Sequence, residues 1–261
     1  MKFNGTFLQA ENIPVPHAFT TRQGGVSTGY LSSMNLGCNR GDDRENVEKN
    51  YEILGNALGF NREDLVLAHQ IHTDIVRCVT REDAGRGVDH REYPECDGLV
   101  TCTPGLTLTV FTADCTPILF YDPVTGAVGA AHAGWRGTAA GIAARVVETM
   151  EEKFGTRPQD IRAAIGPNIG KCCFCTDRDV PDAMMQALGE QAMPYIVPAG
   201  EKYYVDLKGI NALWLRQKGV ENLEISTACT CCQPDIFWSH RVTHGKRGSQ
   251  GAVIVCKGRQ L

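Results

Sequence analysis

The chain has 261 residues, of which 43% are hydrophobic and 21% are charged, and its formal net charge is -4. Such a composition allows a large buried core and excludes a broad basic surface for nucleic acid or an anionic membrane. The sequence has no apolar leader and no run of membrane-spanning length, so we expect a cytoplasmic protein that binds neither nucleic acid nor membrane. Its 12 cysteines are therefore expected to be mostly reduced thiols.

Periodic apolar residues and turn signals predict the elements in chain order. Apolar residues at helical spacing predict helices over 43–60, 138–154, 181–188 and 207–218. Short β-rich runs between turn residues predict strands over 65–68, 75–79, 98–101, 106–111, 117–121, 127–131, 223–227 and 252–256. Because the first strands arrive in runs, the pattern favours an α+β fold over a parallel α/β sheet. No linker or repeat interrupts the chain, so residues 1–261 are expected to form a single domain.

Three metal-binding side chains lie in or beside these apolar runs. His72 lies in A-H-Q-I-H-T-D, Cys115 closes F-T-A-D-C, and His132 opens H-A-G-W-R-G. Two imidazoles and one thiolate suit zinc, and three protein ligands leave the fourth position of a catalytic site open. His69 is expected to point to the opposite face from His72, whose loop projects beyond the strand, so we favour His72 as the ligand. The sequence therefore predicts a reactive zinc site at His72, Cys115 and His132.

Two acidic residues are candidates for supporting roles at this site. Asp114 precedes Cys115, and we expect it to orient a ligand, to act as the catalytic acid–base, or to cap the turn before Pro117. Asp74 is expected to fix the tautomer of His72. A hydrolase that uses Cys115 and His132 without metal is an alternative.

Other polar segments predict contacts to an anionic or sugar substrate. Arg136 and the helix start after it predict an anion site, although a tight turn with Trp135 in the core fits the same residues. The Gly-rich loop 20–27, with Arg22, and the following Asn35 are expected to bind phosphate or ribose, or to form a surface turn.

Basic residues and cysteines are also clustered later in the chain. Five basic residues near the C-terminus favour a solvated face over phosphate binding: Arg241, Lys246, Arg247, Lys257 and Arg259. The runs C-C-F-C at 172–175 and C-T-C-C at 229–232 allow a structural zinc, but their spacings differ from C-x-x-C pairs. They favour buried thiols that lie near one another.

Taken in order, nine motifs resemble those of the YfiH/YlmD family, also called the laccase-domain or polyphenol oxidase family. They are T-T-R-Q-G-G-V-S, N-L-G, H-Q-I-H, C-D-G-L-V-T, T-A-D-C-T-P-I-L-F, A-A-H-A-G-W-R-G-T, I-G-P-N-I-G-K-C-C-F, Y-V-D-L-K-G-I-N and C-T-C-C with F-W-S-H-R. The resemblance implies a four-layer α/β/β/α sandwich with mixed sheets and zinc ligands at His72, Cys115 and His132. It also implies phosphorolysis of adenosine, inosine, guanosine and methylthioadenosine, with deamination of adenosine. The expected partners are nucleosides and phosphate, for a monomer or weak homodimer.

The resemblance leaves other functions open, and two segments of this chain differ from the family's usual motifs. Older family labels imply a copper-dependent polyphenol oxidase, but seven histidines are few for a multicopper enzyme. Some members are called peptidoglycan editing factors, so a metal-binding factor that acts on cell-wall precursor synthesis is another alternative. Where many relatives have C-Y-E-V, this chain has C-F-C-T at 173–176, and R-G-S-Q at 247–250 replaces the frequent T-G-R. Substrate preference is therefore expected to differ if either segment contacts substrate.

Overall fold

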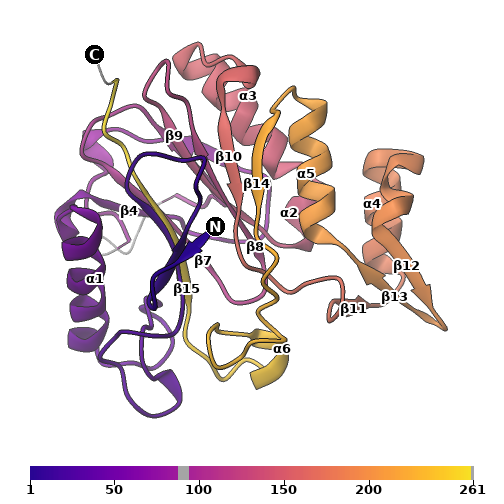
Figure 1. The fold of residues 1–261 in the computed structure, drawn as a ribbon, viewed down its shortest axis with the longest axis horizontal. Helices are drawn as coiled ribbons and strands as arrows, with labels where there is room; N and C mark the ends of the chain where they lie inside the picture. The colour runs from indigo at the N-terminus through magenta and orange to yellow at the C-terminus, as the bar shows by residue number, and fades with distance from the viewer. Residues whose placement is uncertain (88–93, 260–261) are drawn as a thin grey trace.

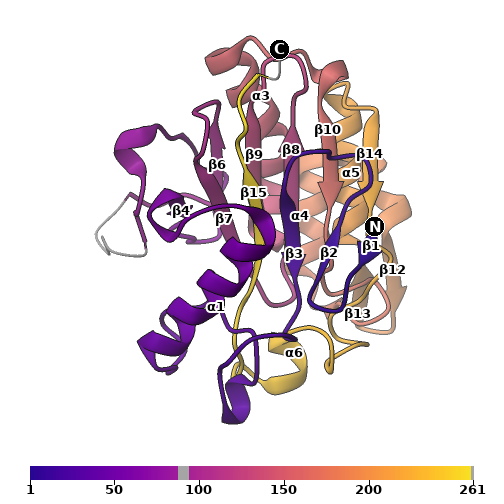
Figure 2. The same ribbon diagram turned by 60° about the vertical axis from the view of Figure 1, so that its left-hand side comes forward.

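The computed structural model describes residues 1–87 and 94–259, which form two six-stranded sheets and a smaller three-stranded sheet (Figures 1 and 2). The first sheet has the order β1 (Lys2–Phe3), β2 (Phe7–Gln9), β3 (His17–Thr20), β15 (Gln250–Val255), β7 (Thr107–Thr112) and β4 (Leu65–Leu67). The second has the order β14 (Asn222–Ile225), β10 (Arg162–Ile165), β8 (Thr116–Tyr121), β9 (Val128–Ala133), β6 (Gly98–Thr101) and β5 (Val76–Cys78). Both sheets are mixed, because β4 runs parallel to β7 while β15 runs antiparallel to it, and β5 runs parallel to β6.

The two large sheets pack against each other, and helices cover their outer faces. Alternate side chains of both sheets, among them Leu108, Ile254 and Leu119, form one buried cluster between the layers. Helix α1 (Arg44–Leu58) covers the outer face of the first sheet, and α3 (Ile142–Phe154) with α5 (Leu207–Gln217) covers that of the second (Figure 1). The expected α/β/β/α sandwich with mixed sheets is therefore confirmed.

The remaining elements lie at the ends of the sandwich. The third sheet has the order β11 (Cys175–Thr176), β13 (Lys202–Val205) and β12 (Ile196–Ala199), and it lies with α4 (Asp179–Leu188) beyond α5 (Figure 1). Two short helices are α2 (Trp135–Ala139), which follows β9, and α6 (His240–Thr243), which precedes β15. Short 3₁₀ helices span Gly29–Leu31, Arg62–Asp64, Arg81–Asp83 and Pro158–Asp160, and a longer one spans Gly189–Tyr195. Among the described residues, no helix has both the length and the apolar character needed to cross a bilayer.

Two sequence-based expectations were wrong in detail. The helix expected over 138–154 is two helices, because Gly141 between α2 and α3 has a left-handed φ of 78° that ends regular α-helix geometry. Pro117 does not make a turn after Cys115: it is the second residue of β8 and pairs in register with His132 of β9. The turn is the short segment Ala113–Cys115, which carries the chain from the first sheet to the second.

Candidate active site

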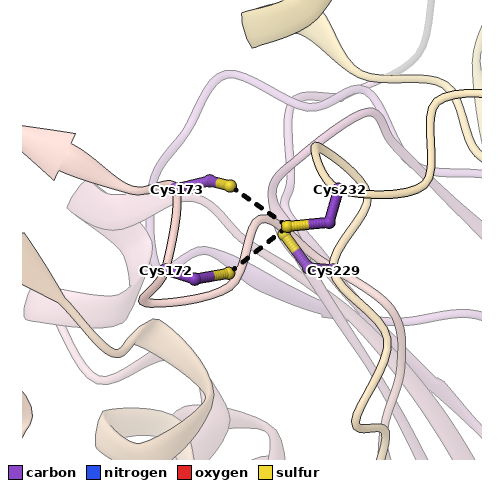
Figure 3. Close-up of side chains that lie close together, drawn as sticks. All are labelled: Cys172, Cys173, Cys229 and Cys232. Atoms are coloured by element: carbon purple, nitrogen blue, oxygen red, sulfur yellow. Dashed lines mark hydrogen bonds between the residues drawn. The ribbon is translucent and has the colours of Figure 1, made fainter.

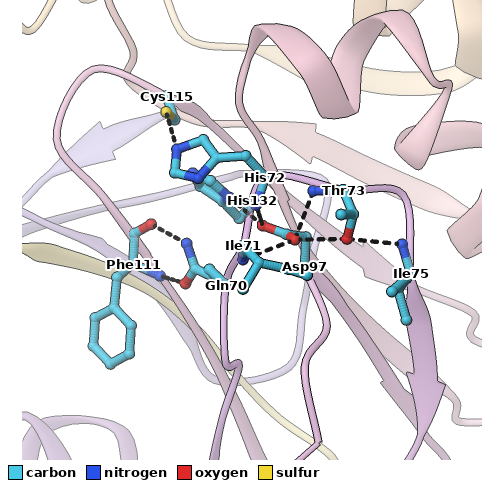
Figure 4. A network of polar contacts seen from close by, with 9 residues as sticks. All are labelled: Gln70, Ile71, His72, Thr73, Ile75, Asp97, Phe111, Cys115 and His132. Atoms are coloured by element: carbon cyan, nitrogen blue, oxygen red, sulfur yellow. Dashed lines mark hydrogen bonds and ion pairs between the residues drawn. The ribbon is translucent and has the colours of Figure 1, made fainter.

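The structure brings the side chains of His72, Cys115 and His132 together at the rim of the sandwich (Figure 4). Their candidate ligand atoms all lie within 4.8 Å of one another, and Nε2 of His72 is 4.0 Å from Sγ of Cys115. The two imidazole rings meet edge to face with their centroids 4.8 Å apart. Three donors that converge from three different segments form the kind of open site that a single metal ion occupies in an enzyme.

Each ligand comes from an element end or a strand that the sheets hold in place. His132 lies in β9 and is 2% exposed, Cys115 lies in the turn between β7 and β8, and His72 lies in the loop that follows β4. His72 and Asp114 have left-handed φ values of 66° and 94°, which non-glycine residues adopt only when their surroundings hold them there. Backbone strain is therefore concentrated at the two loops that present ligands.

Asp97 is the residue that organises the histidine ligands, and its side chain is 0% exposed. Its carboxylate accepts hydrogen bonds from the backbone N–H groups of Ile71, His72 and Thr73, at 3.1, 3.0 and 2.8 Å (Figure 4). It also lies 2.7 Å from Nδ1 of His132, which leaves Nε2 of that ring for a metal. One carboxylate thus shapes the His72 loop and fixes the His132 tautomer, as carboxylates behind metal-bound histidines do.

The interactions in this cluster favour the ionised forms of Asp97 and Cys115. Burial would raise the pKa of Asp97, but His132 and the backbone N–H groups of Thr73 and Ile71 lower it to about 2. Burial would also raise the pKa of Cys115, and the neighbouring His132 and His72 outweigh that effect and lower it. The Cys115 thiolate is therefore accessible near neutral pH, as a metal ligand or nucleophile requires.

Gly134 leaves the space in which the three ligands meet. A Cβ atom at this position would lie 2.8 Å from Cδ2 of His72 and 3.5 Å from Sγ of Cys115. Any side chain here would push the His72 ring from its place, so the glycine of H-A-G-W is part of the site. Together with the donor set and Asp97, this cradle fits a single metal ion.

Replacing Asp97 with asparagine is expected to weaken zinc binding by roughly 10- to 100-fold, the range found when carboxylates behind metal-bound histidines are removed. The amide can accept fewer of the five hydrogen bonds and no longer balances the His132 ring electrostatically. Competition against a fluorescent zinc chelator measures the affinity. Unchanged affinity in Asp97→Asn, or a loss in Asp74→Asn instead, would contradict this role.

Asp74 does not take the role that its sequence position indicated. Its carboxylate pairs with Nε of Arg145 on α3 at 3.4 Å, and Asp97 supports the histidines in its place. The sequence did not predict this role for Asp97, which lies in the C-D-G-L-V-T motif at 96–101. An acidic residue directly before the fully buried strand β6 was the available signal.

Asp114 is anchored to two other loops. Its carboxylate accepts hydrogen bonds from the hydroxyls of Thr230 and Ser239 at 2.6 and 3.0 Å, and from the backbone N–H of Arg241 at 2.7 Å. Its own carbonyl accepts the N–H of Ile169. These contacts support an anchoring role for Asp114 beneath Cys115, and the acid–base role stays a prediction.

Two of the expected substrate contacts, Arg22 and Asn35, bond to backbone groups of neighbouring loops. Arg22 donates to the carbonyls of Ser32 and Pro234 and stacks on Trp238. Asn35 is buried and bonds to the backbone of Gly37. Both side chains thus hold loops together.

Arg136 is exposed at the start of the five-residue helix α2 and lies 4.2 Å from the ring of Trp135. Arg136 is not among the residues that line the pocket next to the metal ligands, which is described below. Trp135 is only half-buried, so it packs at the edge of the small α4 cluster rather than inside the core.

A pocket of about 260 Å³ opens onto the three ligands and contains two other arginines, Arg40 and Arg247. Nε of Arg40 donates to Oγ of Ser249 at 3.2 Å, and Nη1 of Arg247 donates to the same oxygen at 3.1 Å. Arg247 was expected to belong to a solvated face near the C-terminus, but its side chain lines this pocket instead. Leu67, Ala68 and Phe111 contribute the apolar part of its lining.

A four-layer fold with an open His/Cys/His site at the rim defines a distinct class of proteins, and sequence comparison shows which family this chain belongs to. Residues 16–257 match the family described as multi-copper polyphenol oxidoreductase laccase, and the chain belongs to that family. It is 39% identical to the purine nucleoside phosphorylase YlmD of Geobacillus stearothermophilus, over 92% of this chain and 89% of that protein. It is 40% identical to a purine nucleoside phosphorylase of Deinococcus radiodurans, over 95% of this chain and 91% of that protein.

Solved structures agree with this assignment. The crystal structure of YlmD from Geobacillus stearothermophilus superimposes with a TM-score of 0.92 at 36% identity, covering 100% of this chain and 98% of that one. The hypothetical protein YfiH of Bacillus licheniformis gives a TM-score of 0.89 at 37% identity, covering 92% of each chain. The resemblance to the YfiH/YlmD family is therefore confirmed.

Proposed function

We propose that this protein is a zinc-dependent purine nucleoside phosphorylase that also deaminates adenosine. It would convert adenosine, inosine, guanosine or methylthioadenosine and phosphate to the free base and a sugar 1-phosphate. The names of its relatives support the nucleoside class. The observation that carries the proposal is a pair of guanidinium groups beside the three metal ligands, in one pocket.

The two arginines favour an anion between them. Arg40 and Arg247 donate to one hydroxyl, that of Ser249, so two positive charges lie close together, and the described residues that line the pocket include no Asp or Glu. Burial and the charge of Arg40 lower the pKa of Arg247 to about 10. Its Nε is buried and has no hydrogen-bond partner among the described residues. A bound phosphate would accept from both groups and relieve their repulsion.

The three metal ligands would hold the ion that acts on the purine. His72, Cys115 and His132 would bind zinc, with the Nδ1 proton of His132 held at Asp97. When bound, zinc supplies a Lewis acid for the purine and, for deamination, lowers the pKa of a water molecule towards neutrality. Phosphorolysis then requires a phosphate oxygen to bond to C1′ as the C1′–N9 bond breaks and the purine leaves with the electron pair.

The rest of the pocket suits a planar base attached to a sugar. Phe111 and Leu67 offer apolar surface, and the backbone of Phe111 is fixed by the Gln70 amide, which donates at 2.8 Å and accepts at 2.6 Å. Gln70 thereby ties the His72 loop to β7. An apolar wall that is rigidly joined to the ligand loop would hold the base in one orientation relative to the metal.

Copper oxidation of phenols is the second candidate, because the family description names it and a His₂Cys donor set also suits copper. Among the described residues, the other group able to hold a metal consists of four cysteines. The several histidine-rich centres of a multicopper oxidase are therefore absent from that part of the chain. This observation favours zinc and one catalytic centre.

A product screen separates these functions. Zinc-loaded protein is incubated with each of the four nucleosides, with and without phosphate, and free base and ammonia are measured. We expect base release that requires phosphate, with slower ammonia release from adenosine alone. Phenol oxidation by copper-loaded protein, with no base or ammonia from any nucleoside, would favour the oxidase.

A further inference from the structure

Four cysteine side chains from two separate loops converge on a single point (Figure 3). Cys172 and Cys173 lie in the loop between β10 and β11, and Cys229 and Cys232 lie in the loop after β14. Their sulfur atoms all lie within 4.8 Å of one another. None of the four lines the pocket at His72. They therefore form a cluster that the proposed function does not use.

Burial does not explain this cluster. Cys229 is buried, but Cys172 and Cys232 are exposed and Cys173 is only half-buried. Thiols that serve as small hydrophobic side chains are expected in the interior. The expectation that these thiols lie near one another is met, but the expectation that they are buried is wrong for Cys172, Cys173 and Cys232. A surface position is instead where an ion could enter between the loops.

The sulfur atoms lie close to the spacing that a tetrahedral metal site requires. Sγ of Cys232 lies 3.6 Å from Sγ of Cys172 and 3.3 Å from Sγ of Cys173. Zinc–sulfur bonds of about 2.3 Å in a tetrahedron place sulfur atoms about 3.8 Å apart. Each loop supplies two thiols. Small movements of these side chains would bring the four sulfur atoms to the distances of a tetrahedral zinc site.

The surroundings stabilise negative charge on these sulfur atoms. The backbone N–H of Gly170 donates to Sγ of Cys229 at 3.1 Å, as N–H groups do around metal-bound thiolates. The buried Lys208 donates to the carbonyls of Ser226 and Ala228, next to Cys229. The side chain of Lys208 therefore lies beside a centre that would be anionic.

We propose that Cys172, Cys173, Cys229 and Cys232 bind one zinc ion as a structural tetrathiolate site, separate from the one at His72, Cys115 and His132. Binding Zn²⁺ releases the four thiol protons and leaves a centre of net charge -2. No oxidation or reduction takes place.

The site would join the two loops that support the Cys115 turn. Thr230 lies between two of the cysteines, and its hydroxyl donates to Asp114 while its N–H donates to the carbonyl of Asn168. The carbonyl of Asp114 in turn accepts the N–H of Ile169, just before the other cysteine pair. The second zinc would therefore hold Asp114, and through it the position of Cys115.

Metal stoichiometry tests the proposal on the full chain. Protein purified under reducing conditions with zinc should contain two zinc ions, and the double variant Cys173→Ser/Cys232→Ser should contain one. The matched control Cys175→Ser, in the same run but outside the cluster, should keep two. Cys115→Ala should also contain one, so failure at either site is distinguished from failure at the other.

Cobalt substitution of the wild-type protein gives a second measurement that does not depend on a variant folding. Two equivalents of Co²⁺ should bind, one with the intense thiolate charge-transfer absorption of a tetrathiolate centre. Native alkylation followed by peptide mapping should show the four cysteines protected by zinc and exposed by chelator. A zinc content that is the same in Cys173→Ser/Cys232→Ser as in the wild-type protein, or a disulfide between Cys173 and Cys232 in the reduced preparation, would overturn the proposal.

Discussion

Replacing Cys115 with alanine is expected to remove zinc from the pocket and to abolish nucleoside turnover while the fold persists. Cys115 provides the only anionic ligand among the three, and His72 and His132 alone leave too few donors for a stable site. Because metal Lewis acids contribute several kcal/mol of transition-state stabilisation, kcat/KM should fall by at least about 10³-fold. Zinc analysis and steady-state kinetics of the same preparation measure both effects.

The fold itself should tolerate this change, because Cys115 is half-buried in a short turn. With chelator present, the melting temperatures of the variant and the wild-type protein should agree to within a few degrees, or about 1 kcal/mol for a chain of this size. Cys102→Ala, at an exposed cysteine after β6, serves as the control and should keep full activity. Retention of zinc in the pocket by Cys115→Ala would contradict the ligand assignment.

Replacing Arg247 with alanine is expected to raise the KM for phosphate roughly 10- to 100-fold, since a hydrogen bond to a charged group contributes about 1.5–3 kcal/mol. Arg247 and Arg40 share the Ser249 hydroxyl beside the metal ligands, so the loss should appear with phosphate as the varied substrate. The KM for the nucleoside should change much less. Initial rates at saturating nucleoside measure the effect.

Two further variants sharpen this experiment. Arg216→Ala removes an exposed arginine on α5 and is the control for a general loss of positive charge. Arg136→Ala tests the anion site that the sequence favoured at the start of α2. A raised phosphate KM in Arg136→Ala, with a normal value in Arg247→Ala, would place the anion at that helix instead.

The sequence was most informative where the chemistry of single residues is rare. A histidine or cysteine with unusual neighbours at the end of an apolar run marks a ligand without any knowledge of its contacts. His72, Cys115 and His132 were selected in this way, and the structure places them together. Helices with strong periodicity, such as α1, were also found, with ends displaced by one or two residues.

Features that depend on distant contacts were not predictable from the sequence. Arg40 and Ser249 are 209 positions apart, and only the adjacent loops at the sheet rim bring them together. Asp97 reaches His72 and His132 from 25 and 35 positions away. The strands β1, β2 and β3 are short, so they give too little alternation for a pattern to be recognised.

The four cysteines illustrate the same limit. Each run by itself lacks the spacing of a zinc knuckle, because each loop supplies only half of the site. The two cysteine pairs come together only once β10 and β14 are paired in parallel, because that pairing brings the segments after the two strands side by side.

A phosphorylase differs from a hydrolase in that phosphate becomes attached to the sugar. Zinc-loaded wild-type protein is incubated with inosine and phosphate, and the products are followed by phosphorus-31 NMR together with hypoxanthine assay. We predict a sugar 1-phosphate that forms in equal amount to hypoxanthine and is absent with Cys115→Ala. Hypoxanthine without a sugar phosphate, or no product from fully zinc-loaded protein, would contradict the proposed function.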